Sequence, residues 1–516
     1  MRRLAPLLVP LLVPLLACGD ASSSTTTSAT DEPPASTSVA EPDPTTAEPA
    51  STTAPTGSTT ADPGTTSTTT TDPTGDPPAP AFVQIDAADP HRLTWRGQPF
   101  YPAGYYAGAA FNMTGPDFAG DHAAFHTAVM DTLVAGGANY FRVWINWGAL
   151  TNDTVPVEDQ WDLHILHPYL RTGPGEAVDG QPRFDLDAWN PDYFTWLAQA
   201  VDFAADRDLV VQLILLDCWH AGFGLQYGYG ARDYFAAANN INNVDFTDES
   251  AWLDLAGPVF ARHRQFIERV VDTLGARDNL VWETCNEKRA GPHATFAETA
   301  DDPWHRAIAD TIRAREASLG LPTHRLVVPV DLPEHRTVAG HTTPSDDGES
   351  PADMRARLIS EQFAWNTPLI SDNDCCPGQP DPDAVRVKAW AALTAGAHVD
   401  IFNNEMFKSA VLTAPQTAQG IHHVGLVHAF LRDLSVDLVG MTPNDSLVQG
   451  DAWTYARPND EYVLYLPNGG MIDIPGLPAA TALWWDPRNG GAQDAGPGPQ
   501  FTAPSPGDWA LHIRVP

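Results

Sequence analysis

The chain has 516 residues, with 29 Lys and Arg against 65 Asp and Glu, giving a formal net charge of -36. This length exceeds a single small core and fits one large domain with accessory parts. The strong acidity argues against nucleic acid or another polyanion as a partner, because the sequence has no basic cluster that would release counterions. A neutral partner fits the composition better.

The first 17 residues have the features of an export signal. Arg2 and Arg3 precede a short apolar stretch that prolines interrupt, and this stretch is unsuited to span a membrane. The residues before Cys18 resemble the lipobox of bacterial lipoproteins, which implies cleavage before Cys18 and lipid attachment to its sulfur. We therefore expect an exported protein, lipid-anchored to a bacterial membrane or cell surface. An ordinary cleaved signal with a secreted product is the alternative.

Residues 18–80 predict a disordered linker. Ser, Thr, Pro, Ala, Gly, Asp and Glu make up nearly all of it, and it has no aromatic residue, Lys or Arg after Cys18. Such a segment buries too little apolar surface to offset the entropy lost on ordering, so we expect an extended tether.

From residue 82 the sequence alternates apolar runs with helix-like stretches such as 191–206 and 258–274. This pattern indicates parallel strands joined by helical crossovers, and eight such units predict a (β/α)8 TIM barrel, an α/β fold, over residues 82–436. One residue separates the sixth run from the seventh, so one of them is a loop or the sixth run begins inside a helix. The runs begin at Phe100, Asn139, Leu209, Leu280, Arg325, Leu358, Thr367 and His398.

Residues 437–516 change to short alternating runs that indicate a small antiparallel all-β domain. The dipeptides Asn468-Gly469 and Asn489-Gly490 mark turns between its strands, because Asn and Gly tolerate the backbone angles that tight turns require.

The chemistry of a (β/α)8 barrel lies at the C-terminal ends of its strands. Here those ends carry carboxylates, amides and aromatic rings, which suit a sugar because rings stack on its C–H faces and polar groups bond its hydroxyls. A Gly-rich phosphate loop is absent from the sequence, and we expect no cofactor and no metal. The candidate binding residues are Tyr105, Tyr106, Arg142, Trp147, Trp219, His220, Asn286 and Trp365.

The run NLVWETCNE, residues 279–287, ends an apolar strand on Asn286 and Glu287. A carboxyl group where a buried strand meets a loop is partly removed from water, which favours the protonated form that a general acid needs. Glu287 is therefore a catalytic candidate.

Several motifs together resemble the clan of retaining (β/α)8 glycoside hydrolases that includes cellulases and mannanases. They are RLTWRGQPFYPAGYY from Arg92, FRVW at Phe141, DCWH at Asp217 and WETCNE ending at Glu287. The later YVLYLPNGG and WWDPRNGG resemble the β-sandwich that follows such barrels in several bacterial glycosidases. The resemblance implies an enzyme that cleaves O-glycosidic bonds of a poly- or oligosaccharide. By position, Glu287 would be its acid/base, Asn286 would bind a sugar hydroxyl, Arg142 would support the nucleophile and His220 would line the sugar site.

The second catalytic carboxylate departs from this family. The family places glutamate at the end of strand seven, whereas TPLISDND offers Asp372 and Asp374, of which Asp374 is favoured because it lies farther past the strand end. Glu405 after strand eight is a second choice, and a wider separation of the two carboxyls, about 6.5 to 9.5 Å, would make the enzyme inverting. The departure also leaves an alternative function, in which the chain is a non-catalytic surface lipoprotein that binds carbohydrate on a degenerate barrel.

Four cysteines remain after Cys18. In an exported protein they permit a disulfide between Cys218 and Cys285 or a vicinal one between Cys375 and Cys376.

Overall fold

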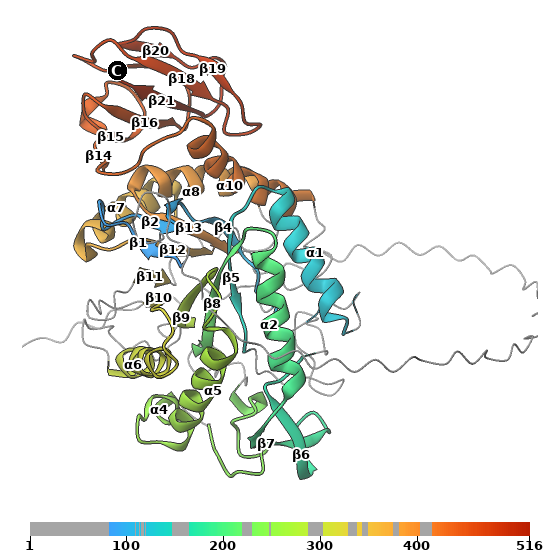
Figure 1. The fold of residues 1–516 in the computed structure, drawn as a ribbon. Coiled ribbons are helices and arrows are strands. Elements are labelled where there is room, and N and C mark those ends of the chain that lie inside the picture. Colours follow the sequence, from blue (N-terminus) through green and yellow to red (C-terminus); the bar gives the residue numbers. More distant parts are fainter. Residues whose placement is uncertain are drawn as a thin grey trace, which may run out of the picture. The chain divides into compact units, whose positions relative to one another are not determined.

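The computed structural model describes residues 82–108, 110–112, 114, 118, 120–146, 165–218, 230–246, 249–286, 303–328, 338–342, 349–374, 381–402 and 415–516. These residues form a barrel surrounded by helices, followed by an antiparallel β domain (Figure 1). The predicted signal and linker, with Cys18, lie outside the described residues.

Eight parallel strands close the barrel, each hydrogen-bonded to the next around the ring. The prediction of a TIM barrel is therefore confirmed. In order around the ring the strands are β4 (Ala103–Tyr106), β5 (Tyr140–Trp144), β8 (Val210–Asp217), β9 (Leu280–Asn286), β10 (Arg325–Val328), β11 (Val338–Thr342), β12 (Leu369–Asp374) and β13 (His398–Phe402).

Helices cover the outside of the barrel (Figure 1). Several begin with proline after a capping side chain: Asn190 accepts a hydrogen bond from the backbone of Asp192, and Ser350 accepts one from Asp353. Such caps satisfy amides that the first helical turn leaves unpaired. The helices are α1 (His122–Ala135), α2 (Pro191–Ala205), α5 (Pro258–Leu274), α6 (Pro303–Ser318), α7 (Pro351–Trp365), α8 (Pro382–Ala395) and α10 (Pro415–Asp433).

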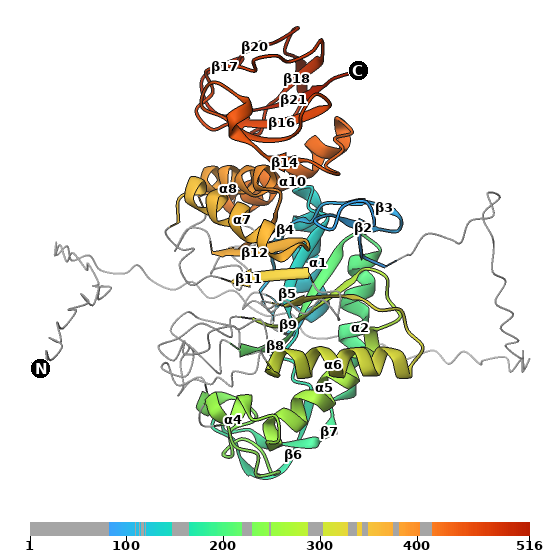
Figure 2. The same cartoon turned by 90° about the vertical axis from the view of Figure 1, so that its left-hand side faces the viewer.

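The sixth strand differs from its prediction. The run that begins at Leu358 is the second half of helix α7. The sixth strand is β11, which lies beside β12 in Figure 2 and pairs with both β10 and β12. A short apolar run does not by itself distinguish a strand from a buried helix. Met354 and Leu358 are buried one helical turn apart, so this run follows the helical period.

A small N-terminal sheet closes the end of the barrel at which its strands begin. Its strands are β1 (Gln84–Ile85), β2 (Leu93–Trp95) and β3 (Gln98–Phe100). Val83, Leu93 and Phe100 pack against residues near the strands' N-terminal ends, which are Tyr140, Val210, Val281, Val327 and Ile370. This apolar plug leaves the C-terminal ends of the strands as the place for polar chemistry.

Two insertions extend the barrel. A hairpin of β6 (Tyr169–Glu176) and β7 (Pro182–Trp189) follows β5, and the segment after β8 includes η3 (Gly230–Arg232) and α4 (Glu249–Leu253). Tyr234 packs edge-on against Tyr169 and Phe184, which joins the two insertions through one aromatic cluster.

The C-terminal domain contains one six-stranded and one two-stranded antiparallel sheet, as the predicted all-β class requires. Tyr462, Leu464 and Leu466 of β16 face the second sheet, whereas Val463 and Tyr465 join the core of the barrel domain. Both faces of β16 are thus covered, which explains why every residue in it is buried. The larger sheet has the order β14 (Thr442–Pro443), β15 (Trp453–Arg457), β16 (Glu461–Leu466), β21 (Trp509–Arg514), β18 (Thr481–Trp485) and β19 (Ala492–Asp494); the smaller one pairs β17 (Met471–Asp473) with β20 (Gln500–Thr502).

The β domain is fixed to the barrel by buried polar and aromatic contacts. Arg386 of α8 donates to both carboxylate oxygens of Asp508, at 2.8 and 3.1 Å, and the Tyr465 hydroxyl donates to Asp508 at 2.7 Å. Trp390 of α8 stacks on Tyr465 with ring centroids 5.4 Å apart.

Within the described residues, no helix has the length and apolarity needed to cross a membrane.

Candidate active site

Arg142 lies in the second barrel strand and is 2 % exposed. Its Nε and Nη2 donate to the two carboxylate oxygens of Glu283 at 2.7 and 2.6 Å. This two-pronged contact joins strand two to strand four inside the barrel, and it fixes both side chains because the planar guanidinium matches the planar carboxylate.

A second layer of contacts holds Glu283. Gln212 of strand three donates from Nε2 to Glu283 Oε2 at 2.8 Å, and the Tyr140 hydroxyl donates to Gln212 Oε1. Strands two, three and four are therefore linked by a single buried network.

Asn286 ends strand four and is fully buried. Its Oδ1 accepts a hydrogen bond from Arg142 Nη2 at 2.6 Å. Arginine can only donate, so the amide oxygen must face Arg142 and the amide nitrogen must face away from it. That nitrogen makes no hydrogen bond within the described residues.

Two further groups surround the Arg142 guanidinium. The ring of Tyr106 lies 4.9 Å from the guanidinium carbon, and Trp144 packs edge-on against Tyr106. Asp400 of strand eight is fully buried, with Oδ2 3.8 Å from Arg142 Nη1. One cation is thus held between two carboxylates, so the interior of the barrel is polar at this level.

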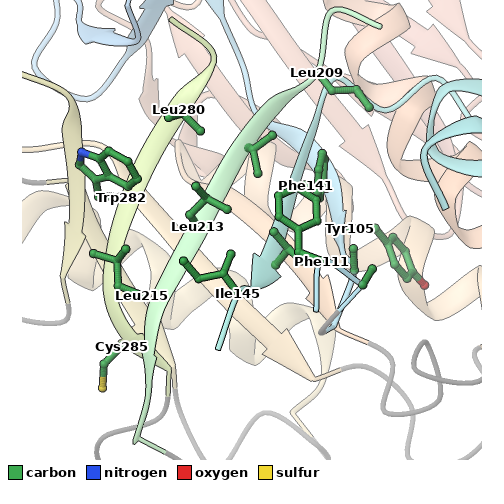
Figure 3. Packing of buried hydrophobic residues seen from close by; sticks show 14 of the residues in the cluster. Tyr105, Phe111, Phe141, Ile145, Leu209, Leu213, Leu215, Leu280, Trp282 and Cys285 are labelled. Atoms are coloured by element: carbon green, nitrogen blue, oxygen red, sulfur yellow. The ribbon is translucent and has the colours of Figure 1, made fainter. Parts of the chain in front are cut away.

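A disulfide joins Cys218 to Cys285 at the C-terminal ends of strands three and four, with the Cα atoms 5.7 Å apart. Cys285 lies at the lower end of β9 in Figure 3, beyond the apolar side chains of Leu213, Leu215 and Trp282. Of the two pairings open from the sequence, the structure contains this one; Cys375 and Cys376 lie outside the described residues.

The predicted aspartates belong to strand seven, as expected. In the register of strands seven and eight, Asp372 lies opposite Asp400, and Asp374 lies opposite Phe402, the last residue of its strand. Asp374 therefore occupies a position nearer the mouth of the barrel than Asp372 does.

Two of the expected binding residues lie elsewhere. Trp365 is the last residue of α7, which leads into the N-terminal end of strand seven, so its position is at the end of the barrel opposite the mouth. Tyr105 is fully buried, and its hydroxyl faces Gly420 of α10 on the helix side of strand one (Figure 3). Burial, together with the charge of Asp400, raises the pKa of Tyr105.

Arg142, Asn286 and Tyr106 lie together in the structure. Glu287 directly follows strand four, but its own position lies outside the described residues. The same is true of Trp147, Trp219, His220 and Glu405.

Glu283, Gln212 and Asp400 complete the network and were missed from the sequence. Each is a polar residue that directly follows a strongly apolar residue of its strand. A polar residue at such a position was the available signal in the sequence, because a polar side chain buried in a strand needs a partner across the barrel.

Among the described residues, no group of three His, Cys, Asp or Glu side chains is arranged to hold a metal ion.

Comparison with known proteins supports the fold. No protein-family model matches the sequence, and no curated protein matches it. A candidate glycoside hydrolase from Bacteroides vulgatus is similar in structure with a TM-score of 0.56 at 14 % identity, over 84 % of this chain and 82 % of that one. A glycoside hydrolase family 5 mannosidase from Rhizomucor miehei matches 69 % of this chain and 99 % of its own at 15 % identity, with a TM-score of 0.44. An endo-β-1,4-mannanase from Thermotoga petrophila matches 80 % of this chain and 91 % of its own at 11 % identity, with a TM-score of 0.40. The first similarity extends over most of both chains and shows a shared fold.

Proposed function

We propose that this protein hydrolyses O-glycosidic bonds of a neutral poly- or oligosaccharide at the C-terminal mouth of its barrel. The observation that carries the proposal is the network of Arg142, Glu283 and Asn286, which fixes the end of strand four immediately before Glu287. A carboxyl group is a more effective catalyst when the backbone that carries it is fixed, because precise positioning lowers much of the activation barrier.

Glu287 acts in this proposal as the general acid that protonates the glycosidic oxygen and then as the base that activates water. The amide nitrogen of Asn286 is buried and has no hydrogen-bond partner among the described residues, and in this proposal it donates to a sugar hydroxyl beside the scissile bond when substrate binds. Such a contact can strengthen as charge develops on the sugar in the transition state.

Asp374 is the proposed nucleophile. Asp372 lies opposite the fully buried Asp400, inside the barrel. Asp374 lies two residues farther toward the C-terminal end of its strand, opposite the last residue of strand eight. A substrate entering from the C-terminal face therefore meets the position of Asp374 first. This assignment makes the enzyme retaining, with a separation of about 5 to 5.5 Å between the two carboxyls.

The retaining assignment is tested by the anomer that forms first. Proton NMR during early hydrolysis should show the same anomeric configuration in product and substrate. The opposite anomer would indicate an inverting enzyme, in which Asp374 or Glu405 activates water rather than attacking the sugar.

Glu287→Gln tests the activity itself. Release of reducing ends from a panel of neutral polysaccharides should fall by several orders of magnitude, while thermal stability and glycan binding are retained. Glu268→Gln, at a partly exposed position of α5, is the matched control and should hydrolyse normally. Full activity of Glu287→Gln would exclude the assignment. Binding by the unaltered protein without any hydrolysis would favour the alternative, a carbohydrate-binding protein that lacks a working nucleophile.

The lipid anchor at Cys18 is part of the same proposal. The resemblance of residues 15–18 to a lipobox supports it, and the linker would then hold the barrel away from the membrane surface. Expression in a bacterium with labelled palmitate should give a labelled protein, and Cys18→Ala should remove both the label and membrane fractionation. A labelled Cys18→Ala protein would contradict the anchor.

A further inference from the structure

Asn146 lies at the mouth of the barrel, just past the end of strand two. Trp144, the last residue of that strand, lies opposite Ile214 of strand three. Asn146 and Leu216 each lie two residues farther along, and Leu216 lies opposite Cys285 of strand four. Asn146 is therefore level with the end of strand four. Adjacent strands are about 4.8 Å apart, so strands two and four are separated by about 10 Å, which a short oligosaccharide can span.

Tyr234 sets which way the Asn146 amide faces. The Tyr234 hydroxyl donates to Oδ1 of Asn146, and this is its one hydrogen bond within the described part of the chain. A buried phenol needs an acceptor for its proton, so the amide oxygen must face Tyr234 and the amide nitrogen must face away from it. Burial, together with the nearby Asp233, holds the pKa of Tyr234 well above its ordinary value, so the hydroxyl keeps this proton at neutral pH.

Tyr234 is itself fixed by the insertion after β8. Its ring packs edge-on against Phe235 and Tyr169, with ring centroids 4.6 and 5.2 Å apart. The side-chain amide of Asn240 donates to its backbone carbonyl at 3.1 Å. The Asn146 amide is therefore oriented before any ligand binds, which lowers the entropy lost on binding.

The amide nitrogen of Asn146 is the group that remains for a ligand. Asn146 is 6 % exposed, and its Nδ2 makes no hydrogen bond to the residues that the structure describes. Unlike the Asn286 nitrogen, it is not among the fully enclosed polar atoms that lack a partner, so a ligand can reach it. An amide N–H donates to the hydroxyl or ring oxygen of a neutral sugar.

We propose that Asn146 is a substrate-binding residue of the hydrolytic site, whose Nδ2 donates to an oxygen of the saccharide, and that Tyr234 positions this donor. The saccharide as ligand rests on the proposed function. Asn146 lies on strand two, whereas the proposed acid/base Glu287 follows strand four. The contact is therefore made away from the bond that breaks, and its loss should raise KM while changing kcat little.

Asn146→Asp distinguishes a binding role from a structural one. Aspartate keeps an oxygen that accepts from Tyr234, so the melting temperature should be nearly unchanged, but it replaces the N–H donor by a second acceptor. A purely structural asparagine would tolerate this change. Asn243→Asp is the matched control, because Asn243 is an exposed residue of the same insertion and undergoes the same chemical change.

Binding is measured by calorimetry in the full chain carrying Glu287→Gln, with cellohexaose, mannohexaose and xylohexaose as probes. Asn146→Asp should weaken the binding of at least one probe by about tenfold or more, the equivalent of one to two hydrogen bonds. In the chain that retains Glu287, it should raise KM for that probe by a similar factor. Tyr234→Phe keeps the donor but frees the amide to rotate, so it should weaken binding less. Asn243→Asp should change neither quantity.

Equal Kd and KM values for the Asn146→Asp and Asn243→Asp proteins would overturn the proposal and leave glycoside hydrolysis itself intact. The absence of saturable binding by all three probes would overturn it as well. Binding that Asn146→Asp weakens, in a protein that hydrolyses none of the probes, would support Asn146 as a binding residue and overturn the hydrolytic function.

A second variant applies if Asn146→Asp lowers the melting temperature. Asn146→Leu combined with Tyr234→Phe replaces both hydrogen-bond partners by apolar groups of similar shape, which costs little stability. This double variant also lacks the donor, so it should show the same loss of binding. Unchanged binding by a stable double variant would overturn the proposal.

Discussion

The Nη2 atom of Arg142 lies 2.6 Å from Oδ1 of Asn286, and this contact sets which way the Asn286 amide faces. The same Arg142 side chain binds Glu283 on strand four. One arginine thus determines both the position of the strand end and the direction of a donor beside Glu287.

Asn286→Asp should separate these two functions. The variant keeps an oxygen that accepts from Arg142, so the network and the melting temperature should be nearly retained. It replaces the outward amide donor by a second oxygen, so kcat/KM should fall about 100-fold or more if that donor binds the transition state. Asn286→Ala is the comparison, since it removes both contacts and should also lower stability. An active Asn286→Asp enzyme would mean that the nitrogen makes no catalytic contact.

Replacing the disulfide by Cys218→Ala with Cys285→Ala should lower the free energy of unfolding by about 4 kcal/mol, because the bond closes a loop between residues 67 apart. Urea unfolding of the variant and the unaltered protein measures the difference. Cys375→Ala with Cys376→Ala is the control for general loss of cysteine. Dithiothreitol should destabilise the control protein but not the Cys218/Cys285 variant. Equal sensitivity of both proteins would show that the Cys218–Cys285 bond is not the source of the stabilisation.

Asp233 should make the protein less stable as pH rises from about 4 to 8. Burial raises the pKa of its carboxyl from the ordinary 3.8 to about 7. The folded state therefore holds a proton that the unfolded state has already lost, so the stability contributed by this group is complete below pH 4 and disappears as pH rises through 7. The full effect is roughly 4 kcal/mol.

Asp233→Asn should remove this dependence and make the protein more stable than the original at pH 8, with little difference at pH 4. Asparagine retains the acceptor for the amide of Phe235, which lies 2.7 Å away. Asp254→Asn is the matched control, since Asp254 is exposed and accepts from Ala256 in the same way at 3.0 Å. Parallel pH profiles of melting temperature for the two variants would contradict the assignment.

The contact between Arg386 and Asp508 should hold the C-terminal domain to the barrel. Asp508→Ala leaves a buried guanidinium without its main partner and should cost about 3 to 5 kcal/mol. Asp383 pairs with the same arginine, but its side chain is 73 % exposed, so Asp383→Ala should cost about 1 kcal/mol or less. Chemical unfolding of the two variants measures both costs, and similar values would show that burial does not decide the strength of these pairs.

Much of the fold was accessible from the sequence because most barrel strands carry their own signal. Seven of the eight coincide with runs rich in branched or aromatic residues. The sixth does not: β11 reads VAGHT, with one strongly apolar residue, and its place depends on hydrogen bonds to β10 and β12 on either side. The competing run at Leu358 is apolar because it covers the barrel as a helix.

The sequence by itself determined that Asn286 ends the fourth strand and that Glu287 follows directly, because strand order and chain adjacency are local properties. Only the tertiary structure decided which polar residues meet. Arg142, Gln212, Glu283 and Asp400 come from four different strands, and closure of the barrel brings them within hydrogen-bond or ionic distance. Closure also decided that Tyr105 faces a helix, since the direction of a side chain depends on register and alternation and not on residue type.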